Sequence, residues 1–271
     1  MKQPIHGAGL GLRRGMLNEM SQLTPDQVDF FEVAPENWMG LGGRFGKQFK
    51  ALTERFPFAC HGLSLSIGSL DPLDVDFVKQ VKQFLDEHSI ETYSEHLSYC
   101  SHDGHMYDLM PIPFTHEAVD HVVLRIKQVQ DILERPLILE NTSTYVRFGD
   151  LTELEFTQEV LEQSGCKMLL DVNNVFVNSI NHGFDPLSYI SQLPTQKIEY
   201  IHIAGHFDEA DDLKVDTHGA PVKQDVWQLL EHAYACHGMR PTLLERDFNF
   251  PPMAELLEEV EHIRGYQYAV C

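Results

Sequence analysis

The sequence predicts an α/β fold of the TIM (β/α)8 barrel class, in one domain that spans residues 1–271. Eight short β-rich runs recur along the chain, and stretches with the apolar periodicity of amphipathic helices lie between them. The 271 residues, 43% of them hydrophobic, suffice for one large core. Neither a Ser/Gly-rich linker nor a low-complexity tract divides the chain, so the alternating units are expected to close into a single barrel.

The predicted strands are short runs rich in β-branched, aromatic and aliphatic residues. In chain order they are IHGAGL (5–10), DFFEVA (29–34), FACHG (58–62), IETYSEH (90–96), PLILEN (136–141), KMLLDV (167–172), IEYIHI (198–203) and PTLLER (241–246). The clearest helical stretches are DPLDVDFVKQVKQFLDEH (71–88), FTHEAVDHVVLRIKQVQDILE (114–134), LTELEFTQEVLEQS (151–164), PVKQDVWQLLEHAYACHG (221–238) and PPMAELLEEVEHI (251–263). Pro, Asp or Thr opens several of them and Gly238 closes one, as is typical of helix ends.

Seven of the eight predicted strands end in a side chain that can bind a metal ion. They are Glu32, His61, His96 with Glu95 before it, Glu140, Asp171, His202 and Glu245. Because the carboxyl ends of parallel strands meet on one face of a barrel, these side chains are expected to meet at one mouth. The long loop after His202 can bring Asp216 and His218 to the same mouth, and Asn174 adds a neutral amide.

A metal centre explains this set better than separate structural roles. Any single histidine here is more simply a hydrogen-bonded core residue. Buried carboxylates at Glu140, Asp171 and Glu245, however, would cost several kcal/mol each if unpaired, and Arg246 is the one cation at a predicted strand end. Four carboxylates and four imidazoles suit two or three ions, and a donor set without thiolates suits iron or manganese at least as well as zinc.

The charge and the cysteines limit the partners. Lys and Arg number 20 against 41 Asp and Glu, a net charge of −21 that disfavours nucleic acid and anionic membranes as partners. The start of the chain lacks the apolar segment of a secretion signal, and no run approaches the ~18 apolar residues of a membrane span. Five cysteines without C-x-x-C spacing (Cys60, Cys100, Cys166, Cys236 and Cys271) favour the reducing cytoplasm.

Three further residues near the predicted mouth are candidates for catalysis. His206 is a candidate for proton transfer or for orienting a ligand, with a solvated loop histidine as the alternative. Glu36 and Asn37, in the segment PENWMG, are candidates for a substrate wall, with an ordinary aromatic-anchored loop as the alternative. The glycines of GAGLG (7–11) are spaced wrongly for a dinucleotide loop. The thiol of Cys60 is expected to point away from the mouth.

An ordered series of motifs resembles the multinuclear non-haem iron-dependent oxidative enzymes, the family that includes the methanobactin-forming oxidase. The motifs are GAGLGLR, FEVAPENWMG, HGLSLSIG, SEHLSY, LENTSTY, LLDVNNVFVNS, IHIAGH, DTHG and LLERD, from about residue 7 to about residue 247. The resemblance implies a xylose-isomerase-like barrel and dioxygen-dependent modification of cysteines in a ribosomally made precursor peptide. It also implies a small helper protein that binds the leader of that peptide. The stretch GHMYDLMPIPFT is most similar to members that make copper-binding peptides.

The same resemblance implies which residues hold the metal. His61, His96 and Glu140 would hold one iron, Glu140 would bridge to a second iron held by Asp171, His202 and Glu245, and Asn174, Asp216 and His218 would form a third site. Two or three ions in mixed Fe(II) and Fe(III) states would act with dioxygen as cosubstrate, and manganese or zinc would be alternative occupants of the purified protein. The third site has one anionic ligand and a neutral amide, so it is expected to bind most weakly.

Three other classes remain as alternatives. An endonuclease-four-like zinc phosphodiesterase uses a similar ligand arrangement, but Asn174 stands where that class has histidine, and the acidic chain has no evident phosphate-binding patch. A divalent-metal sugar isomerase or epimerase fits the barrel but not the histidine-rich ligand set. A non-catalytic metal-binding protein is the third alternative.

Overall fold

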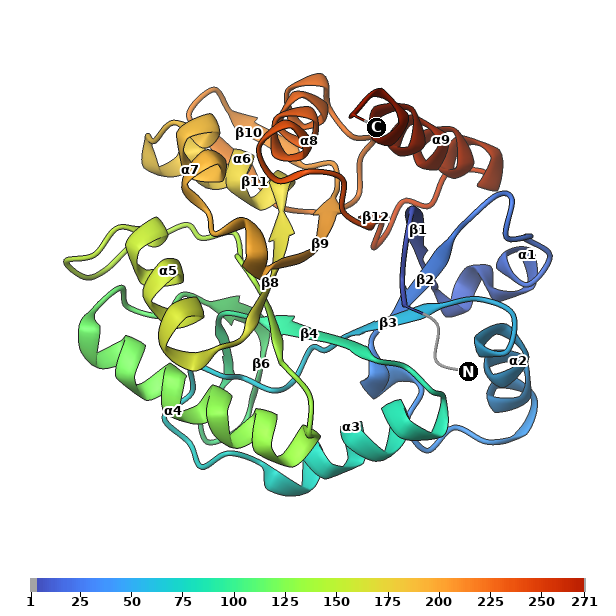
Figure 1. Cartoon of the computed structure of the whole chain (residues 1–271), viewed down its shortest axis with the longest axis horizontal. Helices are drawn as coiled ribbons and strands as arrows, with labels where there is room; N and C mark the ends of the chain where they lie inside the picture. The colour runs from blue at the N-terminus through green and yellow to red at the C-terminus, as the bar shows by residue number, and fades with distance from the viewer. Residues whose placement is uncertain (1–3, 271) are drawn as a thin grey trace.

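In the computed structural model, which describes residues 4–270, eight parallel strands close into a barrel and helices cover its outside (Figure 1). The strands pair in the order β1-β12-β9-β8-β7-β4-β3-β2, and β2 pairs with β1 to close the ring. Their bounds are β1 Ala8–Gly11, β2 Phe30–Val33, β3 Phe58–His61, β4 Thr92–His96, β7 Ile138–Glu140, β8 Lys167–Asp171, β9 Ile198–Ile203 and β12 Thr242–Leu244. All eight predicted strands and the predicted TIM barrel are confirmed.

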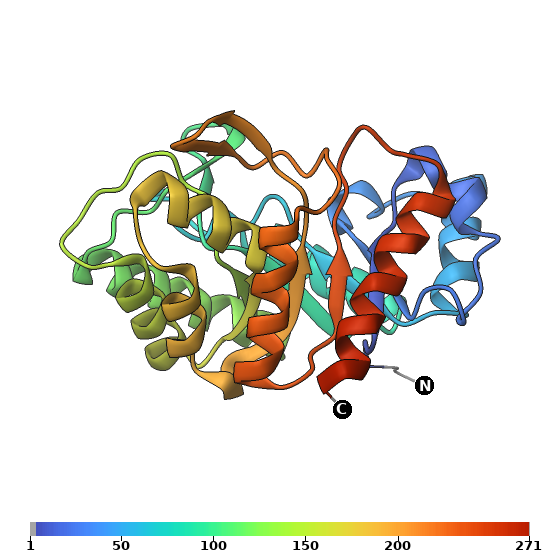
Figure 2. The same ribbon diagram turned by 90° about the horizontal axis from the view of Figure 1, so that it is seen from above.

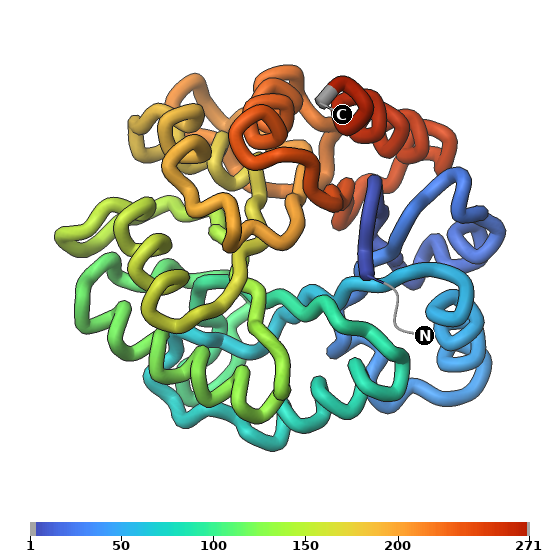
Figure 3. The backbone as a smooth tube through the Cα atoms, in the orientation of Figure 1, coloured from blue at the N-terminus to red at the C-terminus, as the bar shows by residue number. Residues whose placement is uncertain are grey.

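The helices form an outer ring around these strands (Figure 3). Their bounds are α1 Leu17–Met20, α2 Gly43–Thr53, α3 Val75–Glu87, α4 His116–Leu133, α5 Glu153–Ser164, α6 Val172–His182, α7 Pro186–Gln192, α8 Gln224–His237 and α9 Met253–Val270, with short 3-10 turns η1 Arg14–Met16, η2 Pro35–Asn37 and η3 Thr195–Lys197. A capping box between Thr152 and Glu155 starts α5. Helices α1, α2, α6 and α7 lie outside the five helical stretches named from the sequence. Helix α6 begins directly after β8 because Asp171 both ends the strand and caps the helix.

Two antiparallel hairpins stand apart from the barrel. The first pairs β5 Tyr99–Ser101 with β6 His105–Met110, and the second pairs β10 Phe207–Ala210 with β11 Leu213–Val215. Each hairpin follows a barrel strand, β4 or β9, at its carboxyl end. In Figure 2 the β10-β11 hairpin projects at the top, whereas α9 ends at the bottom. The hairpins therefore belong to the face where the strand ends converge.

The barrel interior has an apolar layer and, above it, a polar layer. The apolar layer contains Ile5, Phe30, Ala59, Ile138, Leu169, Tyr200 and Leu243. Because side chains alternate along a strand, the residue two positions beyond each of six of them also points inward. Those residues are Glu32, His61, Glu140, Asp171, His202 and Glu245, and all six are buried. The apolar layer thus closes the barrel beneath a group of acids and imidazoles.

The glycines of GAGLG belong to barrel packing. Gly9 lies in β1, and a Cβ atom built on it would lie 2.5 Å from the ring of Phe30. A larger residue at position 9 would displace the apolar layer, so the motif serves strand packing and not dinucleotide binding.

No helix within residues 4–270 has the length and apolar character needed to cross a bilayer.

Candidate metal centre

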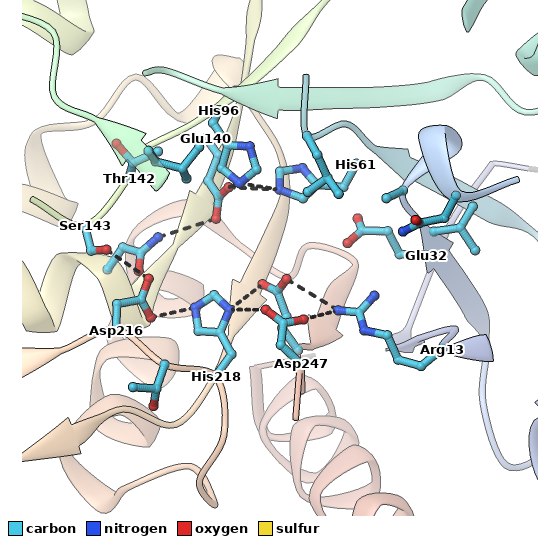
Figure 4. A pocket seen from close by; sticks show the side chains of 18 residues that line it. Arg13, Glu32, His61, His96, Glu140, Thr142, Ser143, Asp216, His218 and Asp247 are labelled. Carbon is cyan, nitrogen blue, oxygen red and sulfur yellow. Dashed lines mark hydrogen bonds and ion pairs between the residues drawn. The ribbon is translucent and has the colours of Figure 1, made fainter. Parts of the chain in front are cut away.

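A cavity of about 460 Å³ opens where the carboxyl ends of the barrel strands meet (Figure 4). Seven of the nine predicted metal ligands line it: His61, His96, Glu140, Asn174, Asp216, His218 and Glu245. The other two, Asp171 and His202, are fully buried and lie within one cluster with Glu140 and Glu245. The structure therefore brings all nine residues to one centre, and their role as ligands stays a prediction.

The first cluster consists of His61, His96 and Glu140. The Oε2 atom of Glu140 lies 3.1 Å from Nε2 of His61 and 3.3 Å from Nε2 of His96. On its other side, the His61 ring is fixed by a 2.7 Å hydrogen bond between Nδ1 and the hydroxyl of Ser94. That hydroxyl also contacts the Tyr200 hydroxyl at 2.6 Å. The packing of the barrel interior therefore sets which nitrogen of His61 faces the cluster.

The second cluster consists of Glu140, Asp171, His202 and Glu245. Nδ1 of His202 lies 3.0 Å from Glu245 and 3.7 Å from Oε1 of Glu140, so Glu140 is common to both clusters. Nε2 of the same ring lies 3.1 Å from Glu32. Glu32 thus orients the His202 ring from the side opposite the cluster, as carboxylates beside metal-binding histidines commonly do.

The predicted third group lies at the rim of the cavity. Oδ1 of Asp216 lies 2.6 Å from Nε2 of His218, and Asp216 itself accepts hydrogen bonds from Ser143 and from the side chain of Asn173. The other ring nitrogen of His218, Nδ1, lies 3.3 Å from Asp247 and 3.5 Å from Glu245. His218 therefore lies between Asp216 at Nε2 and the pair Glu245 and Asp247 at Nδ1. The possible metal-binding group that contains His218 is formed with Glu245 and Asp247, not with Asn174 and Asp216.

Burial and neighbouring charges give these groups opposite pKa shifts. Burial lowers the pKa of His61, but the Glu140 carboxylate outweighs it and raises that pKa to about 9. Burial and the charge on His61 lower the pKa of His96 to about 4. Although burial opposes it, the surrounding imidazoles hold the pKa of Glu140 below its usual range. Burial and the Glu140 charge raise the pKa of Asp171. Strong shifts in opposite directions within one cavity are typical of functional centres.

The residues fit bound metal ions. Two buried atoms in the centre, Oδ2 of Asp171 and Oδ1 of Asn174, make no hydrogen bond, and a buried polar atom without a partner costs roughly 1–3 kcal/mol. Four more buried atoms lie close to oppositely charged side chains without the geometry of a hydrogen bond, namely Oε2 of Glu140, Nδ1 of His202, Nε2 of His218 and Oε2 of Glu245. Nitrogen and carboxylate oxygen donors that converge in this way suit iron, manganese or zinc.

The three predicted catalytic residues lie at different depths. Asn37 lines the cavity. Glu36 is not among the lining residues found within residues 4–270, and its Oε1 accepts the backbone N–H of Leu63 at 2.7 Å. His206 is also outside the lining, with 1% of its surface exposed, and its Nδ1 lies 2.8 Å from Oδ1 of Asn173. Their catalytic roles stay predictions.

The cation beside the acids is one that the sequence did not point to. Arg246, the one cation at a predicted strand end, binds Glu259 on α9 through its guanidinium at 2.8 Å. Arg13, two residues past the end of β1, lines the cavity instead, where it contacts Asp247 and lies 3.7 Å from Glu245. The motif GLGLR offered a signal for Arg13, since it places a cation just beyond a strand end.

The cysteines behave largely as expected. Cys60, Cys100 and Cys166 are buried and free, and Cys60 on β3 belongs to the large apolar cluster that strands and helices form together, not to the layer inside the barrel. Cys236 is free and exposed. Cys271 lies outside the described residues.

One buried acid far from the centre provides a test of buried-charge energetics. Burial raises the pKa of Glu153, at the start of α5, to about 7, and one of its oxygens accepts a 3.1 Å hydrogen bond from Asn178. Because this pKa is raised, the stability that the neutral acid provides is complete below the unfolded pKa near 4.3 and is lost as pH rises toward about 7.

Replacing Glu153 with Gln is therefore expected to remove this pH dependence. The amide oxygen can still accept from Asn178, and the side chain is neutral at every pH. Relative to wild type, the free energy of unfolding of E153Q is expected to increase by on the order of 2–3 kcal/mol between about pH 5 and about pH 8. Urea unfolding at both pH values measures this difference, and a constant difference would contradict a raised pKa at Glu153.

Comparison with known proteins identifies the family. Residues 7–268 match the family model described as RiPP precursor modification enzyme MbnB/TglH/ChrH, where RiPP denotes a ribosomally made, post-translationally modified peptide. A protein of Shewanella sediminis named only UPF0276 protein is 64% identical over 97% of this chain and 95% of its own length. A UPF0276 protein of Pseudomonas aeruginosa is 56% identical over 97% of this chain and 93% of its own length.

Solved structures with the same fold are much more distant in sequence. The 3-keto-D-glucoside 4-epimerase YcjR of E. coli has a TM-score of 0.64 at 13% identity, covering 97% of this chain and all of its own. Endonuclease IV of Thermus thermophilus has a TM-score of 0.62 at 14% identity, covering 98% of this chain and all of its own. A xylose isomerase-like TIM barrel protein of Mycobacterium smegmatis has a TM-score of 0.63 at 11% identity, covering 97% of each chain. At these identities the likeness establishes the xylose isomerase-like barrel alone. The family match over nearly the whole chain is the decisive finding: the chain belongs to the RiPP precursor modification enzyme family MbnB/TglH/ChrH.

Proposed function

We propose that this enzyme is an iron- and dioxygen-dependent oxidase of cysteine residues in a ribosomally made precursor peptide. The observation that carries the proposal is the sharing of Glu140 between two groups of buried nitrogen and oxygen ligands at one open mouth. A shared carboxylate suits two ions held side by side, as two-metal catalysis requires. The proposed iron ligands are those implied by the family resemblance, with two or three ions in mixed Fe(II) and Fe(III) states.

The chain's own residues bind and orient in this reaction. Ser94 and Glu32 fix the rings of His61 and His202, so Nε2 of His61 and Nδ1 of His202 face the centre. Leu63 and Leu109 give the cavity apolar walls against which a cysteine side chain can lie. When bound, iron supplies a Lewis acid that favours the thiolate of a substrate cysteine and electrons for the reduction of dioxygen.

The three residues outside the ligand set have distinct proposed roles. We assign Asn37, on the cavity wall, to contact with the peptide. Glu36 holds the loop that carries Leu63, through the backbone N–H of that residue. His206 positions Asn173, whose amide donates to Asp216. Glu36 and His206 thus act through other residues in this proposal.

The proposed partners are a cysteine-containing precursor peptide and a small helper protein that binds its leader, both in the cytoplasm. The product is proposed to bind copper, because residues 104–115 resemble members that make copper-binding peptides. The β5-β6 hairpin contains much of this stretch, and Leu109 from it lines the cavity.

Anaerobic purification followed by metal counting and Mössbauer spectroscopy tests this proposal. We expect two or three iron ions per chain, and dioxygen consumption only when a cysteine-containing precursor from a neighbouring reading frame is supplied with its helper protein. The same peptide with its cysteines changed to serine is the control and is expected to leave dioxygen unconsumed. Exclusive zinc content with cleavage of an abasic duplex would favour the phosphodiesterase instead.

A further inference from the structure

His202 and His218 are held in the same way, although they come from different parts of the chain. In His202, one ring nitrogen faces the carboxylate of Glu32 at 3.1 Å and the other faces the buried cluster. A carboxylate that accepts the N–H of a metal-binding histidine fixes which nitrogen is left for the metal. His202 therefore offers Nδ1 to the cluster.

His218 has a corresponding carboxylate in Asp247. Oδ2 of Asp247 lies 3.3 Å from Nδ1 of His218, while Oδ1 of the same carboxylate contacts the Arg13 guanidinium (Figure 4). Arg13 is itself fixed by a 3.3 Å hydrogen bond from its Nε to the backbone oxygen of Arg246. Asp247 is thus held between a cation and an imidazole, with one oxygen directed at each.

Two positions are available for a cation beside His218. One lies at Nδ1, between Glu245 and Asp247, but Arg13 already contacts Asp247 and lies 3.7 Å from Glu245, so a metal ion there would be close to a guanidinium. The other lies at Nε2, beside Asp216. Nε2 of His218 lies 2.6 Å from the Asp216 carboxylate without the geometry of a hydrogen bond, and Oδ1 of Asn174 is buried without a partner. Both residues line the cavity. Like-charge repulsion at the first position favours the second.

We propose that Arg13 and Asp247 are positioning residues that leave Nε2 of His218 free to bind a metal ion with Asp216 and Asn174. Arg13 holds the Asp247 carboxylate, and that carboxylate accepts the Nδ1–H of His218. Asp247 is then not a metal ligand, although it lies within a possible ligand cluster. This inference rests on metal binding, one part of the proposed function, and does not depend on oxidase activity.

The substitution Asp247→Asn tests the assignment because Arg13 would control how the new amide is oriented. A guanidinium only donates hydrogen bonds, so it would keep the amide oxygen and turn the NH2 group toward His218. Nδ1 would then have to accept, and the proton would move to Nε2. We expect D247N to weaken one zinc site by roughly 10–100-fold, with the other sites unchanged. Zinc titration of the full chain against a competing chelator measures this.

Nitrogen-15 histidine spectra of the zinc-loaded protein identify the zinc-bound nitrogen of His218 directly. We expect Nε2 to carry zinc and Nδ1 to carry the proton in wild type. Zinc on Nδ1, or no zinc on His218, would overturn the assignment.

A double variant separates positioning from simple charge effects. In R13A/D247N the amide is free to rotate, so we expect most of the zinc affinity lost in D247N to return. R13A alone is expected to weaken zinc binding at the same site, because Asp247 loses the group that holds it. If Arg13 acted only as a nearby positive charge, R13A would strengthen zinc binding both in the wild-type protein and in D247N, and a stronger site in R13A alone would refute the proposal. Glu259→Gln, which frees Arg246 in the same loop, is the control and is expected to leave zinc affinity unchanged. Failure of dioxygen-dependent peptide modification would leave these zinc measurements standing.

Discussion

Replacing Glu140 with Gln is expected to abolish dioxygen-dependent peptide oxidation and to weaken two metal sites at once. One oxygen of Glu140 lies 3.1 Å from Nε2 of His61, and the other lies 3.7 Å from Nδ1 of His202. The amide would replace a shared anionic ligand by a neutral oxygen and an NH2 group that repels cations. Loss of residues that only orient a ligand costs roughly 10–100-fold in metal affinity, so loss of this ligand is expected to cost at least ~100-fold.

Metal counting after dialysis against buffered iron or zinc measures this effect, together with oxygen consumption. E153Q is the matched control, because it makes the same chemical change at a buried carboxyl outside the centre. His96→Ala provides a second comparison, since His96 belongs to the first cluster alone and should cost one ion. If E140Q retained its full metal content, the two clusters would not share this carboxylate and the proposed arrangement would be wrong.

The barrel and the gathering of acids and imidazoles at its strand ends were predictable because both follow from local rules. Strand pleating places the residue two positions beyond an inward-facing apolar side chain on the same inner face. Leu169 and Asp171 show this on β8, as do Tyr200 and His202 on β9. Parallel strands then bring these polar ends together, whatever their separation in sequence. Alternation and topology therefore sufficed to place the predicted ligands at the strand ends in one mouth.

The orientation of individual groups was not predictable, because it depends on contacts between distant loops. Glu32 lies at a strand end as the candidate ligands do, yet it contacts Nε2 of His202, the ring nitrogen that faces away from the cluster. Arg246 follows Glu245 directly, and alternation turns its side chain outward to Glu259. Arg13 reaches the centre because the loop after β1 passes beside the loop after β12. Such pairings require the three-dimensional path of both loops, which no spacing rule supplies.

Replacing Asp171 with Asn is expected to stabilise the metal-free protein and to destabilise the metal-loaded one. Asp171 is fully buried, and its Oδ2 atom makes no hydrogen bond. Burial raises the pKa of Asp171 well above its usual range. For an acid with a raised pKa, the stability of the neutral form is complete below the unfolded pKa of about 3.9 and is lost as pH rises through the folded value. At neutral pH the carboxyl therefore costs stability that an amide does not.

The amide keeps the structural role of Asp171. Oδ1 of Asp171 accepts the backbone N–H of Asn174 at 2.7 Å, and an amide oxygen can accept the same bond. The metal-free variant is thus expected to gain on the order of 1–3 kcal/mol at neutral pH, because the amide carries no charge that must be buried. At roughly 2–4 °C per kcal/mol for a chain of this size, the melting temperature should rise by several degrees. With metal the order reverses, because each ion adds about 2.7 kcal/mol at a free concentration of 100 times its dissociation constant and the variant loses this contribution.

Thermal unfolding with a chelator and with zinc distinguishes these states. Asp74→Asn is the matched control, because Asp74 also caps a helix through its side chain, accepting from Phe77 at 2.9 Å, but is exposed to solvent. D74N is expected to show no gain without metal and no added loss with it. A lower melting temperature of D171N in both conditions would mean that Asp171 serves only as the cap of α6. A gain without metal and a loss with it requires that the buried acid be costly by itself and stabilised by a bound cation, which is the physical condition of a metal ligand.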